Sequence, residues 1–461
     1  MNVQPDRNST ARWRQLDLRH HLSPFSDYLA RQEAGGNRII VEAEGCWLTD
    51  SEGHKLLDAM AGLWCVAVGY GRNELAEAAY RQLQELPYYN SFFQTTVPPA
   101  VELAERLAEL TPEGFNRAFF GSSGSESNDT VVRLVRHYWH CVSKPEKTDF
   151  ISREYAYHGS TMAAASLGGM RPMQERFGLP LPGFHHVMPP YWYDFGGDLS
   201  PEELGLKAAK AIEDKILEVG PDKVAAFIGE PVQGAGGVLV PPPSYWPEVQ
   251  RICRQYDVLI VADEVICGFG RTGEWFGSQA YGIEPDLMTM AKQITSGYLP
   301  LSAVMVHDRI GEALIDYEGG EFAHGYTYSG HPVCCALALE NLRILDEEGI
   351  VERVKTDTGP YLQECLQSLA DHPLVGEVRG IGMLGALELV QDKATRSRFP
   401  SSAEATIKCR THCFDNGVVI RAVRDAMIMS PPLTISREEI DQVVARLQQS
   451  LDQTANDLGV G

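Results

Sequence analysis

A run of small residues at 121–129, Gly-Ser-Ser-Gly-Ser-Glu-Ser-Asn-Asp, has the composition of an anion-binding loop. It follows a short apolar stretch and opens a helical pattern that continues to His140. Free backbone N–H groups and the dipole at a helix N-terminus favour a phosphate at such a place. Gly124 allows a close backbone approach, and Ser123 and Ser125 add hydroxyl donors. The alternative is an ordinary helix start with Ser125 as its cap.

Two polar residues at the ends of predicted strands could act on a bound cofactor. Asp263 ends an apolar run, where α/β sheets place their ligands and a carboxylate can pair with a cationic nitrogen. Lys292 follows the apolar strand Leu287–Met290, where a desolvated amine can act as a nucleophile or form a Schiff base. The alternatives are a strand-end cap and a lysine that extends to solvent. With the phosphate loop, these groups match the three needs of pyridoxal phosphate: a phosphate anchor, an acid for the pyridine nitrogen and an amine for the aldehyde.

Two other patterns match known sites only formally. Gly268-Phe-Gly-Arg-Thr-Gly273 fits the dinucleotide fingerprint, which would indicate a nicotinamide-dependent dehydrogenase. The residues after it make a poor helix start, and Asp263-Glu264 would place two acids beside a pyrophosphate. Cys409 and Cys413 lie one helical turn apart with His412 between them, but no second ligand pair accompanies them. We therefore predict neither a dinucleotide site nor a metal site.

The overall composition limits the class of protein. The 461 residues include 40 Lys+Arg and 62 Asp+Glu, a formal charge of 40 − 62 = −22, which argues against nucleic-acid binding. The ten cysteines form no CxxC pair and do not suggest a disulfide framework. Residues 1–37 lack the apolar segment of a signal peptide, and no stretch approaches the roughly 20 apolar residues that span a bilayer. We predict a cytoplasmic protein without membrane contact.

The order of the predicted elements indicates an α/β fold. From about residue 115, short apolar runs alternate with helical stretches such as 202–219 and 244–256, which is typical of a mostly parallel sheet covered by helices. The predicted strands are Arg117–Phe120, Thr148–Ser152, His185–Met188, Val224–Gly229, Val258–Asp263, Leu287–Met290 and Ala303–Val306.

Both ends of the chain have a different pattern from this central part. Residues 38–59 predict an antiparallel meander, and residues 72–86 and 98–110 have helical spacing. After Pro332 a smaller α+β unit is predicted. Its helices are at 333–370 with a break at Glu348-Gly349, at 402–415 and at 436–453, and its strands are near 375–379, 382–390, 418–421 and 426–430. The expected division is an N-terminal segment at 1–60 that packs with a small domain at 331–461, and a large cofactor-binding domain at 61–330.

The sequence resembles the class III (omega) aminotransferases among the fold-type I pyridoxal-phosphate enzymes, over nearly its whole length. Its greatest similarity is to bacterial members that act on polyamines and aryl amines. The motifs that carry the resemblance are Asp58-Ala-Met-Ala-Gly-Leu-Trp-Cys65, Ser123-Gly-Ser-Glu126, Tyr157-His-Gly-Ser160, Gly229-Glu-Pro-Val-Gln-Gly234, Asp263-Glu-Val265, Gly268–Gly273 and Thr327-Tyr-Ser-Gly-His-Pro332.

The resemblance implies roles at the matching positions. Lys292 would form the Schiff base with pyridoxal 5′-phosphate and carry the proton, and Asp263 would keep the pyridine nitrogen protonated. The further cofactor contacts that it implies are Ser123, Gly124 and Ser125 for the phosphate, Tyr157 with its neighbour His158 and Val265 for the ring faces, Glu230 for the ring hydroxyl side, and Thr327 for the phosphate of the neighbouring subunit. The active site would therefore need a homodimer, with a tetramer as the larger alternative.

The implied reaction is a ping-pong transfer of an amino group from a primary amine to a keto acid, pyruvate. Arg421, on the predicted strand Val418–Arg421, would bind the keto-acid carboxylate as a bidentate fork and swing away for amines. The implied amine pocket consists of Phe25, Trp64, Phe92 or Phe93, and Tyr326 from across the subunit interface. Transamination of β-alanine or γ-aminobutyrate, decarboxylation, racemisation and a non-catalytic scaffold are the alternatives.

Two positions depart from the family pattern. Gln293 stands directly after the lysine where Gly is usual, and its side chain is expected to crowd or hydrogen-bond the region of the Schiff base. Ser122 stands where Gly is commoner in the phosphate loop. Neither change removes a functional group that the chemistry requires.

Overall fold

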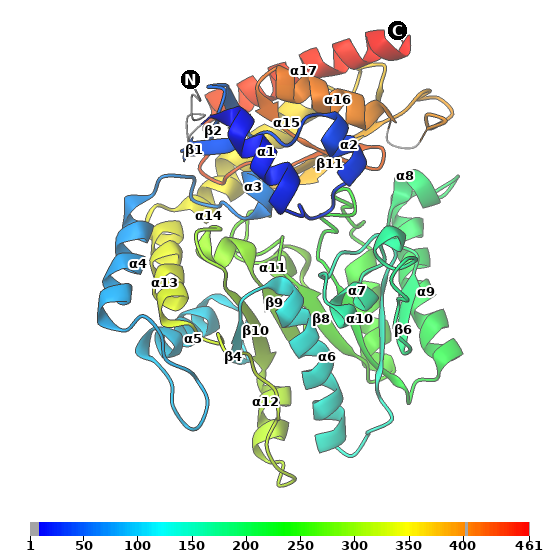
Figure 1. The fold of residues 1–461 in the computed structure, drawn as a ribbon. Coiled ribbons are helices and arrows are strands. Elements are labelled where there is room, and N and C mark those ends of the chain that lie inside the picture. The colour runs from blue at the N-terminus through cyan, green and yellow to red at the C-terminus, as the bar shows by residue number, and fades with distance from the viewer. Residues whose placement is uncertain (1–8, 402–403, 461) are drawn as a thin grey trace.

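The computed structural model describes residues 9–401 and 404–460. At its centre is a seven-stranded sheet of order β4-β10-β9-β8-β7-β5-β6, with a second, smaller layered region above it in Figure 1. Only β10 runs antiparallel to its neighbours, so the other six strands share one direction. The strands are β4 (Phe115–Gly121), β5 (Asp149–Arg153), β6 (Phe184–Val187), β7 (Val224–Gly229), β8 (Leu259–Asp263), β9 (Leu287–Met290) and β10 (Ser302–His307). The predicted α/β class and all seven predicted strands are confirmed, with ends shifted by two residues at most.

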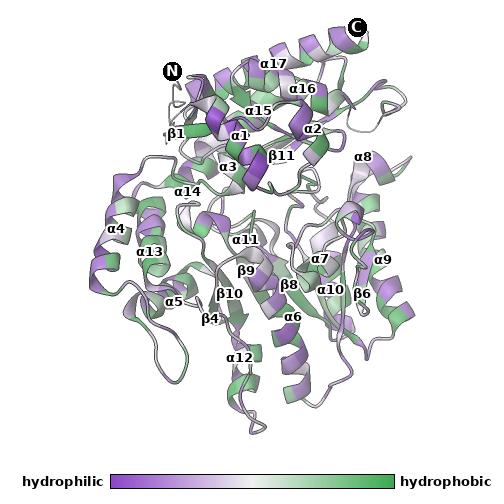
Figure 2. Ribbon diagram, viewed as in Figure 1, coloured by the Kyte–Doolittle hydropathy of each residue, from purple (hydrophilic) through white to green (hydrophobic). Residues whose placement is uncertain are grey.

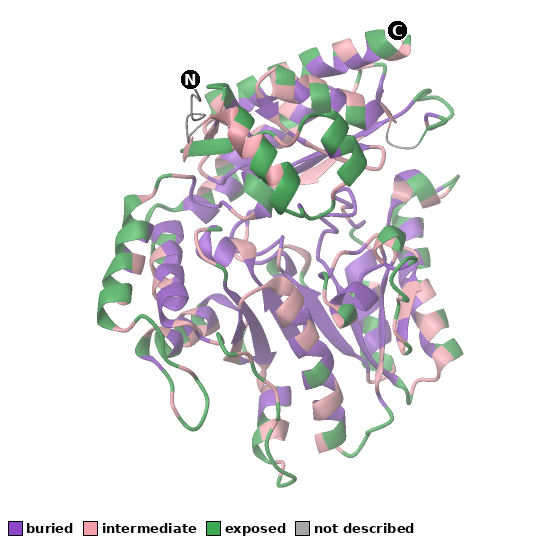
Figure 3. Cartoon of the chain, in the orientation of Figure 1, coloured by how far each residue is buried: buried purple, intermediate pink, exposed green. Residues whose placement is uncertain are grey.

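Helices cover both faces of this sheet because its strands alternate apolar side chains between two cores. Ile228 and Val261 belong to a core shared with α6, whereas Phe227 and Ile260 belong to a core shared with α9 and α10. Burial on both faces explains why these strands appear in the sequence as continuous apolar runs. The covering helices are α6 (Gly124–Cys141), α7 (Met162–Leu167), α9 (Pro201–Val219), α10 (Tyr245–Gln255) and α12 (Asp308–Ile315). Hydropathy and burial follow the same layering, with apolar, buried strands beneath amphipathic helices (Figures 2 and 3).

Two four-stranded sheets lie at the other end of the molecule, and both draw on the C-terminal part of the chain. The first has the order β1-β2-β3-β13 and joins the N-terminal meander to a C-terminal strand, and the second has the order β11-β12-β15-β14. Their strands are β1 (Ile40–Glu44), β2 (Trp47–Asp50), β3 (Lys55–Asp58), β13 (Val418–Val419), β11 (Val375–Ile381), β12 (Leu384–Leu389), β15 (Ala426–Met429) and β14 (Arg421–Val423).

The predicted single strand Val418–Arg421 is wrong in one respect. The chain breaks at Ile420, so that Val419 pairs with Asp58 of the first sheet while Arg421 pairs with Ile428 of the second. Val418 and Ile420 are both buried, which fixes this crossing between the sheets in the core.

The remaining helices that were predicted are present, whereas several short helices were not predicted. The break at Glu348-Gly349 is confirmed, and Gly349 has the left-handed φ of 61° that such a break favours. The expected helix at 402–415 is observed from Glu404, and residues 402 and 403 lie outside the described residues. The helices α1, α2, α3, α7, α8, α11 and α12 were not predicted. The helices not yet given are α1 (Thr10–His20), α2 (Tyr28–Glu33), α3 (Ala61–Trp64), α4 (Asn73–Glu85), α5 (Pro98–Leu110), α8 (Trp192–Phe195), α11 (Gly277–Tyr281), α13 (Pro332–Glu347), α14 (Ile350–Arg353), α15 (Gly359–Gln367), α16 (Glu404–Asp415) and α17 (Arg437–Leu458), with short 3₁₀ turns at Arg171–Met173 and Lys292–Thr295 and a π turn at Val354–Thr358. Within the described parts of the chain, no helix is both long and apolar enough to cross a membrane.

A buried carboxylate links the β11–β12 sheet to segments that flank the central sheet. Glu388 on β12 accepts hydrogen bonds from Arg379 at 2.7 Å and from the Tyr191 hydroxyl at 2.6 Å, and it pairs with Arg398. Arg379 also donates to the carbonyl of Gly237 at 2.7 Å. Burial raises the pKa of Glu388, but the two arginines outweigh that effect and hold the pKa below its ordinary value of 4.5.

Replacing this carboxylate should destabilise the whole chain. We expect Glu388→Gln to lower the free energy of unfolding by about 3 kcal/mol, because it leaves two arginines without their shared counter-ion. The ionised carboxylate stabilises the fold above about pH 4.5, and that contribution is lost as the pH falls through the lowered folded-state pKa. Urea unfolding between pH 7 and pH 4 measures both effects, and the difference between parent and variant should shrink on acidification. Asp214→Asn, in an exposed pair with Lys210, is the control and should change the free energy of unfolding far less than Glu388→Gln.

Candidate active site

The candidate site lies at one edge of the central sheet, where parallel strands end next to one another. Asp263 ends β8, and Lys292 follows β9 by two residues. Strands β8 and β9 are adjacent and in register, with Asp263 opposite Thr289. Glu230 directly follows β7, the next strand along. The topology therefore brings the predicted carboxylates and the predicted lysine to the same edge.

Asp263 is buried and held by three hydrogen-bond donors. Its Oδ2 accepts from His158 Nδ1 at 2.7 Å and from Asn128 Nδ2 at 2.9 Å, and its Oδ1 accepts from the backbone N–H of Val265 at 3.1 Å. Burial alone would raise the pKa of this carboxyl, but the donors, His158 first, hold it below its ordinary value. An ionised carboxylate with an available lone pair on Oδ1 can bind one more N–H group.

Lys292 has unusual backbone and side-chain surroundings. Its φ of 52° is left-handed, which is uncommon for a residue with a side chain and is typical of functional sites. Among the described residues its amine has no hydrogen-bond or ion-pair partner. Burial lowers its pKa, opposed by the charges of nearby groups that include Asp263 and Glu230. The amine is therefore biased toward its neutral, nucleophilic form.

The loop before α6 leaves backbone donors free at the helix start. Ser123, rather than Ser125, caps the helix, because its Oγ accepts from the N–H of Glu126 at 3.2 Å. Ser125 Oγ accepts from the N–H of Ser160 at 3.0 Å, which ties the loop to the segment after β5. The first N–H groups of α6 have no partner within the helix and can bind an anion. Ser122, the second departure from the family pattern, donates its N–H to the Glu126 carboxylate at 2.5 Å.

Glycine at position 124 matches the narrow space around it. A Cβ placed there would lie 3.1 Å from both methyl carbons of Val265. Gly124, Ser125, Val265 and Lys292 are all partly exposed, whereas the residues behind them are buried. The partly exposed groups therefore line an accessible site that is supported from behind by Asn128, His158, Glu230 and Asp263.

Glu230 and Tyr157 form a second supported unit. The two carboxylate oxygens of Glu230 accept from the N–H groups of Tyr157 at 3.2 Å and Gly234 at 2.9 Å. Burial raises the pKa of Glu230, with His158 and Asp263 acting on it in opposite directions. The backbone of Tyr157 is thereby fixed to the strand end that carries Glu230.

Of the predicted substrate residues, two contact each other in this chain and three are exposed. The Arg421 guanidinium lies 5.0 Å from the centre of the Trp64 ring, and burial lowers its pKa, opposed by Tyr157. Arg421 also lines a cavity of about 570 Å³ with Gly62 and Leu63. In contrast, Phe25, Phe92 and Phe93 are exposed on this single chain, with Phe93 at 89%.

The last predicted substrate residue, Tyr326, and the predicted phosphate contact Thr327 lie on one loop near the start of α6. The Tyr326 hydroxyl donates to the carbonyl of Glu126 at 3.0 Å in the same chain. Thr327 is exposed, and its carbonyl accepts from Tyr88 at 2.7 Å. A contact of either residue with a neighbouring subunit stays a prediction.

The expectation for Gln293 is not what the structure shows. The side chain is buried, and its Nε2 donates to the carbonyls of Ile266 at 2.9 Å and Gly268 at 2.8 Å rather than to any group of Lys292. Asn341 of α13 donates to the carbonyls of Gln293 at 2.9 Å and Ile294 at 3.1 Å. The two amides therefore fasten the lysine turn to the loop after Asp263 and to α13.

Sequence reasoning missed Asn128 and Asn341. Asn128 could have been found, since it lies four residues after Gly124 and so on the same face of a helix. Asn341 had no such signal, because it contacts the lysine turn from 48 residues away.

The Gly268–Gly273 loop packs against protein rather than opening to a ligand. A Cβ on Gly270 would meet Leu433 at 3.0 Å, and one on Gly273 would meet the Lys355 backbone at 3.2 Å. The adjacent Glu264 is buried and accepts from the N–H groups of Gly277 and Ser278. This close packing does not support a dinucleotide there.

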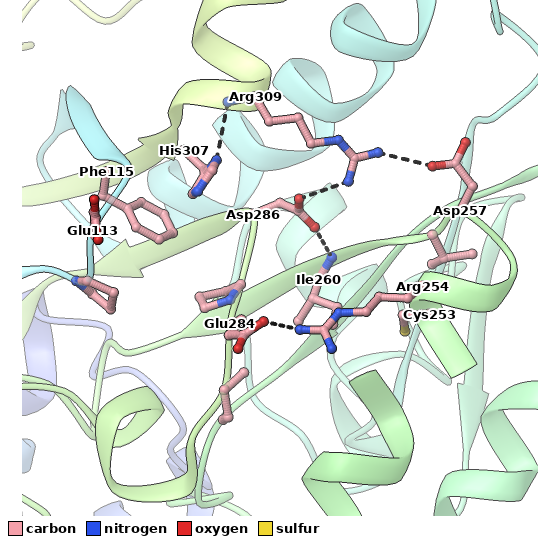
Figure 4. Close-up of a pocket in the computed structure, with 14 residues that line it drawn as sticks. Glu113, Phe115, Cys253, Arg254, Asp257, Ile260, Glu284, Asp286, His307 and Arg309 are labelled. Atoms are coloured by element: carbon pink, nitrogen blue, oxygen red, sulfur yellow. Dashed lines mark hydrogen bonds and ion pairs between the residues drawn. The ribbon is translucent and has the colours of Figure 1, made fainter. Parts of the chain in front are cut away.

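A separate cavity of about 440 Å³ lies at the opposite edge of the sheet, at the amino ends of β8 and β9 (Figure 4). Most of its charged groups pair with one another: Arg309 contacts Asp257 at 3.0 Å and Asp286 at 3.2 Å, and Arg254 pairs with Glu284. Glu113 also lines the cavity.

Comparison with known proteins gives a consistent result. A family model described as Aminotransferase class-III matches residues 28–451. The chain is 58% identical, over 99% of both chains, to a putrescine–pyruvate aminotransferase of Pseudomonas aeruginosa. It is 42% identical, over 95% of both, to a diaminobutyrate–2-oxoglutarate transaminase of Halomonas elongata. Among solved structures, the omega transaminase of Pseudomonas jessenii in complex with PMP matches with a TM-score of 0.95 and 43% identity, over 97% of this chain and 99% of that one.

The Gln293 amide can be tested by unfolding. We expect Gln293→Met, which is similar in volume, to lower the free energy of unfolding by about 1–3 kcal/mol, because two buried carbonyls lose their shared donor. Gln293→Glu should cost at least as much, since a carboxyl group in its ionised form would face the same two carbonyls. Denaturant unfolding monitored by circular dichroism measures both variants. A Gln293→Met protein as stable as the parent would contradict the fastening role.

Proposed function

Because the chain belongs to the class III aminotransferases, we propose that it transfers the amino group of a primary amine to pyruvate. The amine is a diamine such as putrescine or an aryl-alkyl amine, and the products are an aldehyde or ketone and alanine. The observation that carries transamination is the unpartnered, partly buried amine of Lys292 beside the hydrogen-bonded carboxylate of Asp263. The 58% identical relative supports the choice of amine and acceptor.

The cofactor of this family, pyridoxal 5′-phosphate, is the cofactor of this chain, and the residues present fit it. Lys292 offers a free amine, Asp263 Oδ1 an available lone pair, and the first turn of α6 unpaired N–H groups for a phosphate. Glycine at position 124 lets the phosphate loop pack closely against Val265, since a Cβ there would lie 3.1 Å from both of its methyl carbons. When bound, the cofactor supplies an aldehyde that condenses with amines and a ring that withdraws electrons from the carbon bearing the nitrogen.

Four residues of the chain would act directly on the bound cofactor and substrate. Lys292 Nζ, whose pKa is lowered by burial, would take the proton from the amine-bearing carbon of the substrate and return it to the adjacent cofactor carbon. Asp263, ionised and held by His158 and Asn128, would keep a proton on the ring nitrogen. Tyr157 and Val265 would contact the two faces of the ring. Hydrolysis would release the carbonyl product and leave the amino group at the site, and pyruvate would then take up that group through the reverse steps and leave as alanine.

Arg421 would allow one site to bind both pyruvate, which has a carboxylate, and an amine, which has none. Its guanidinium can bind the pyruvate carboxylate through two parallel hydrogen bonds. In the present conformation it lies on the face of Trp64, which leaves an alternative resting place when an amine without a carboxylate is bound. Trp64, Phe25, Phe92 and Phe93 would supply apolar contacts to that amine.

A homodimer would complete this pocket. Phe25, Phe93 and Tyr328 are exposed at 78%, 89% and 59%, which is unusual for large apolar side chains and supports a covering partner. In such a dimer Thr327 would reach the phosphate of the partner subunit, and Tyr326 would contribute to its amine pocket. We place the enzyme in the cytoplasm, in keeping with its acidic surface and its unpaired cysteines.

Lys292 gives the first test of the proposed function. The parent protein should be yellow, bleached by putrescine or 1-phenylethylamine, and restored by pyruvate. Lys292→Ala should lose the absorption band and the borohydride-fixed cofactor, and its kcat should fall by about 10⁴-fold or more, because the nucleophile and the general base are removed together. Ordinary turnover by Lys292→Ala would refute the assignment, and a panel of amines against pyruvate and 2-oxoglutarate would identify the substrate pair.

Arg421 gives a second, independent test. Arg421→Met should raise the KM for pyruvate about tenfold to a hundredfold, the effect expected when a charged hydrogen-bonded pair is lost. The half-reaction with 1-phenylethylamine, which has no carboxylate, should change less than threefold. A parallel loss for both substrates would contradict a specific role in carboxylate binding.

A further inference from the structure

The segment that carries Trp64 has a strained backbone. Directly after β3, the chain places Ala61 at φ 48°, Gly62 at φ 65° and Trp64 at φ 60°. Two of these three residues have side chains and are therefore disfavoured in the left-handed region. Trp64 is nevertheless 2% exposed, so its ring is held in one place despite an unfavourable backbone. Some other group must hold the segment in this conformation.

The carboxylate of Asp58 is that group. Asp58 is fully buried at the end of β3, and its Oδ1 accepts from the N–H of Met60 at 2.9 Å. Its Oδ2 accepts from the N–H of Gly62 at 2.7 Å and from the Tyr70 hydroxyl at 2.7 Å. The carboxylate thus binds both N–H groups that flank Ala61, and Tyr70 fixes its orientation.

The segment held in this way leads directly to both substrate-facing groups. The backbone N–H of Trp64 donates to the Met60 carbonyl at 2.9 Å, so the position of the ring depends on the anchored turn. Arg421 rests on that ring. The backbone of Asp58 also lies opposite Val419, two residues before Arg421. Movement of the anchored turn would therefore displace the tryptophan and the arginine together.

We propose that Asp58, with Tyr70, is a positioning residue that sets substrate specificity by holding Trp64 and Arg421 in place. This inference rests on the proposed function, since it takes Trp64 and Arg421 as the groups that contact substrate. Asp58 does not contact substrate itself and acts through the conformation of residues 60–64. Its loss should raise KM for both substrates more than it lowers kcat, and should leave Lys292 able to bind the cofactor.

The test is a double-mutant cycle on the holoenzyme. Asp58→Asn keeps the volume but provides only one acceptor oxygen, and it should raise the KM for 1-phenylethylamine about tenfold, the scale of a lost buried hydrogen bond. Trp64→Ala should raise the same KM by itself. If Asp58 acts through Trp64, adding Asp58→Asn to Trp64→Ala should change that KM less than twofold further. If the fold-changes in KM of the two single variants multiply in the double variant, the two residues act independently and the proposal is overturned.

A direct readout of the tryptophan accompanies the kinetics. Acrylamide quenching, taken as the difference between a protein and its Trp64→Phe counterpart, isolates Trp64 from the other tryptophans. This difference should show a buried ring in the parent and an accessible ring in Asp58→Asn. An unchanged quenching constant would overturn the proposal. If Trp64→Ala itself leaves KM unchanged while quenching responds to Asp58→Asn, the substrate role in the proposed function fails and the positioning of the ring stands.

Two further variants distinguish a specific effect on Trp64 from a general loss of stability. Asp50→Asn removes a buried carboxylate from a turn of the same sheet, where it accepts from the N–H groups of Glu52 and His54, both at 2.9 Å. It should lower stability without exposing Trp64. Tyr70→Phe removes one of the three donors and should give a smaller change in KM and quenching in the same direction, which keeps the cycle usable if Asp58→Asn folds poorly.

Discussion

The chemistry of this protein depends on one constraint, the adjacency of two buried strands whose ends carry opposite functional groups. Strands β8 and β9 pair in parallel, so the carboxylate of Asp263 and the amine of Lys292 are held at one edge of a sheet that is covered on both faces. Burial disfavours the charged form of both groups: it lowers the pKa of Lys292 and would raise that of Asp263. For Asp263 the hydrogen-bond donors outweigh burial and hold the pKa below its ordinary value. One group is left ionised and the other is biased toward neutrality, which is the combination that an electron-withdrawing cofactor and a proton carrier require.

Around this pair the structure uses buried amides and carboxylates to fix backbone rather than to touch ligands. Asn128 orients Asp263, Gln293 and Asn341 fasten the lysine turn, and Asp58 holds the strained turn before Trp64. Each binds two or more backbone or side-chain groups in a place that water does not reach. A buried polar group that loses its partner destabilises the fold, so these hydrogen bonds hold the local geometry.

The sequence predicted the central sheet well because its strands are buried on both faces and so form unbroken apolar runs. The site residues that follow those runs, Asp263 and Lys292, could be placed for the same reason. The prediction failed where the decisive contact was distant or where the backbone departed from an ordinary element. Nothing local in the sequence shows that Gln293 turns toward Ile266, or that the strand near 420 breaks between two sheets. The helices α1 and α2 were missed because their exposed faces carry little apolar periodicity.

The break at Ile420 has a consequence for how this scaffold can vary. Arg421 begins a strand of the C-terminal sheet, while the residues just before it complete a sheet whose other three strands lie near the N-terminus. If Arg421 binds the acceptor as proposed, acceptor recognition depends jointly on Asp58 and Arg421, two residues more than 350 positions apart in the chain. Recombination between relatives with a crossover anywhere between these positions would combine an arginine from one parent with a supporting strand from the other. Exchange of complete genes, or coordinated change at both ends, preserves the match.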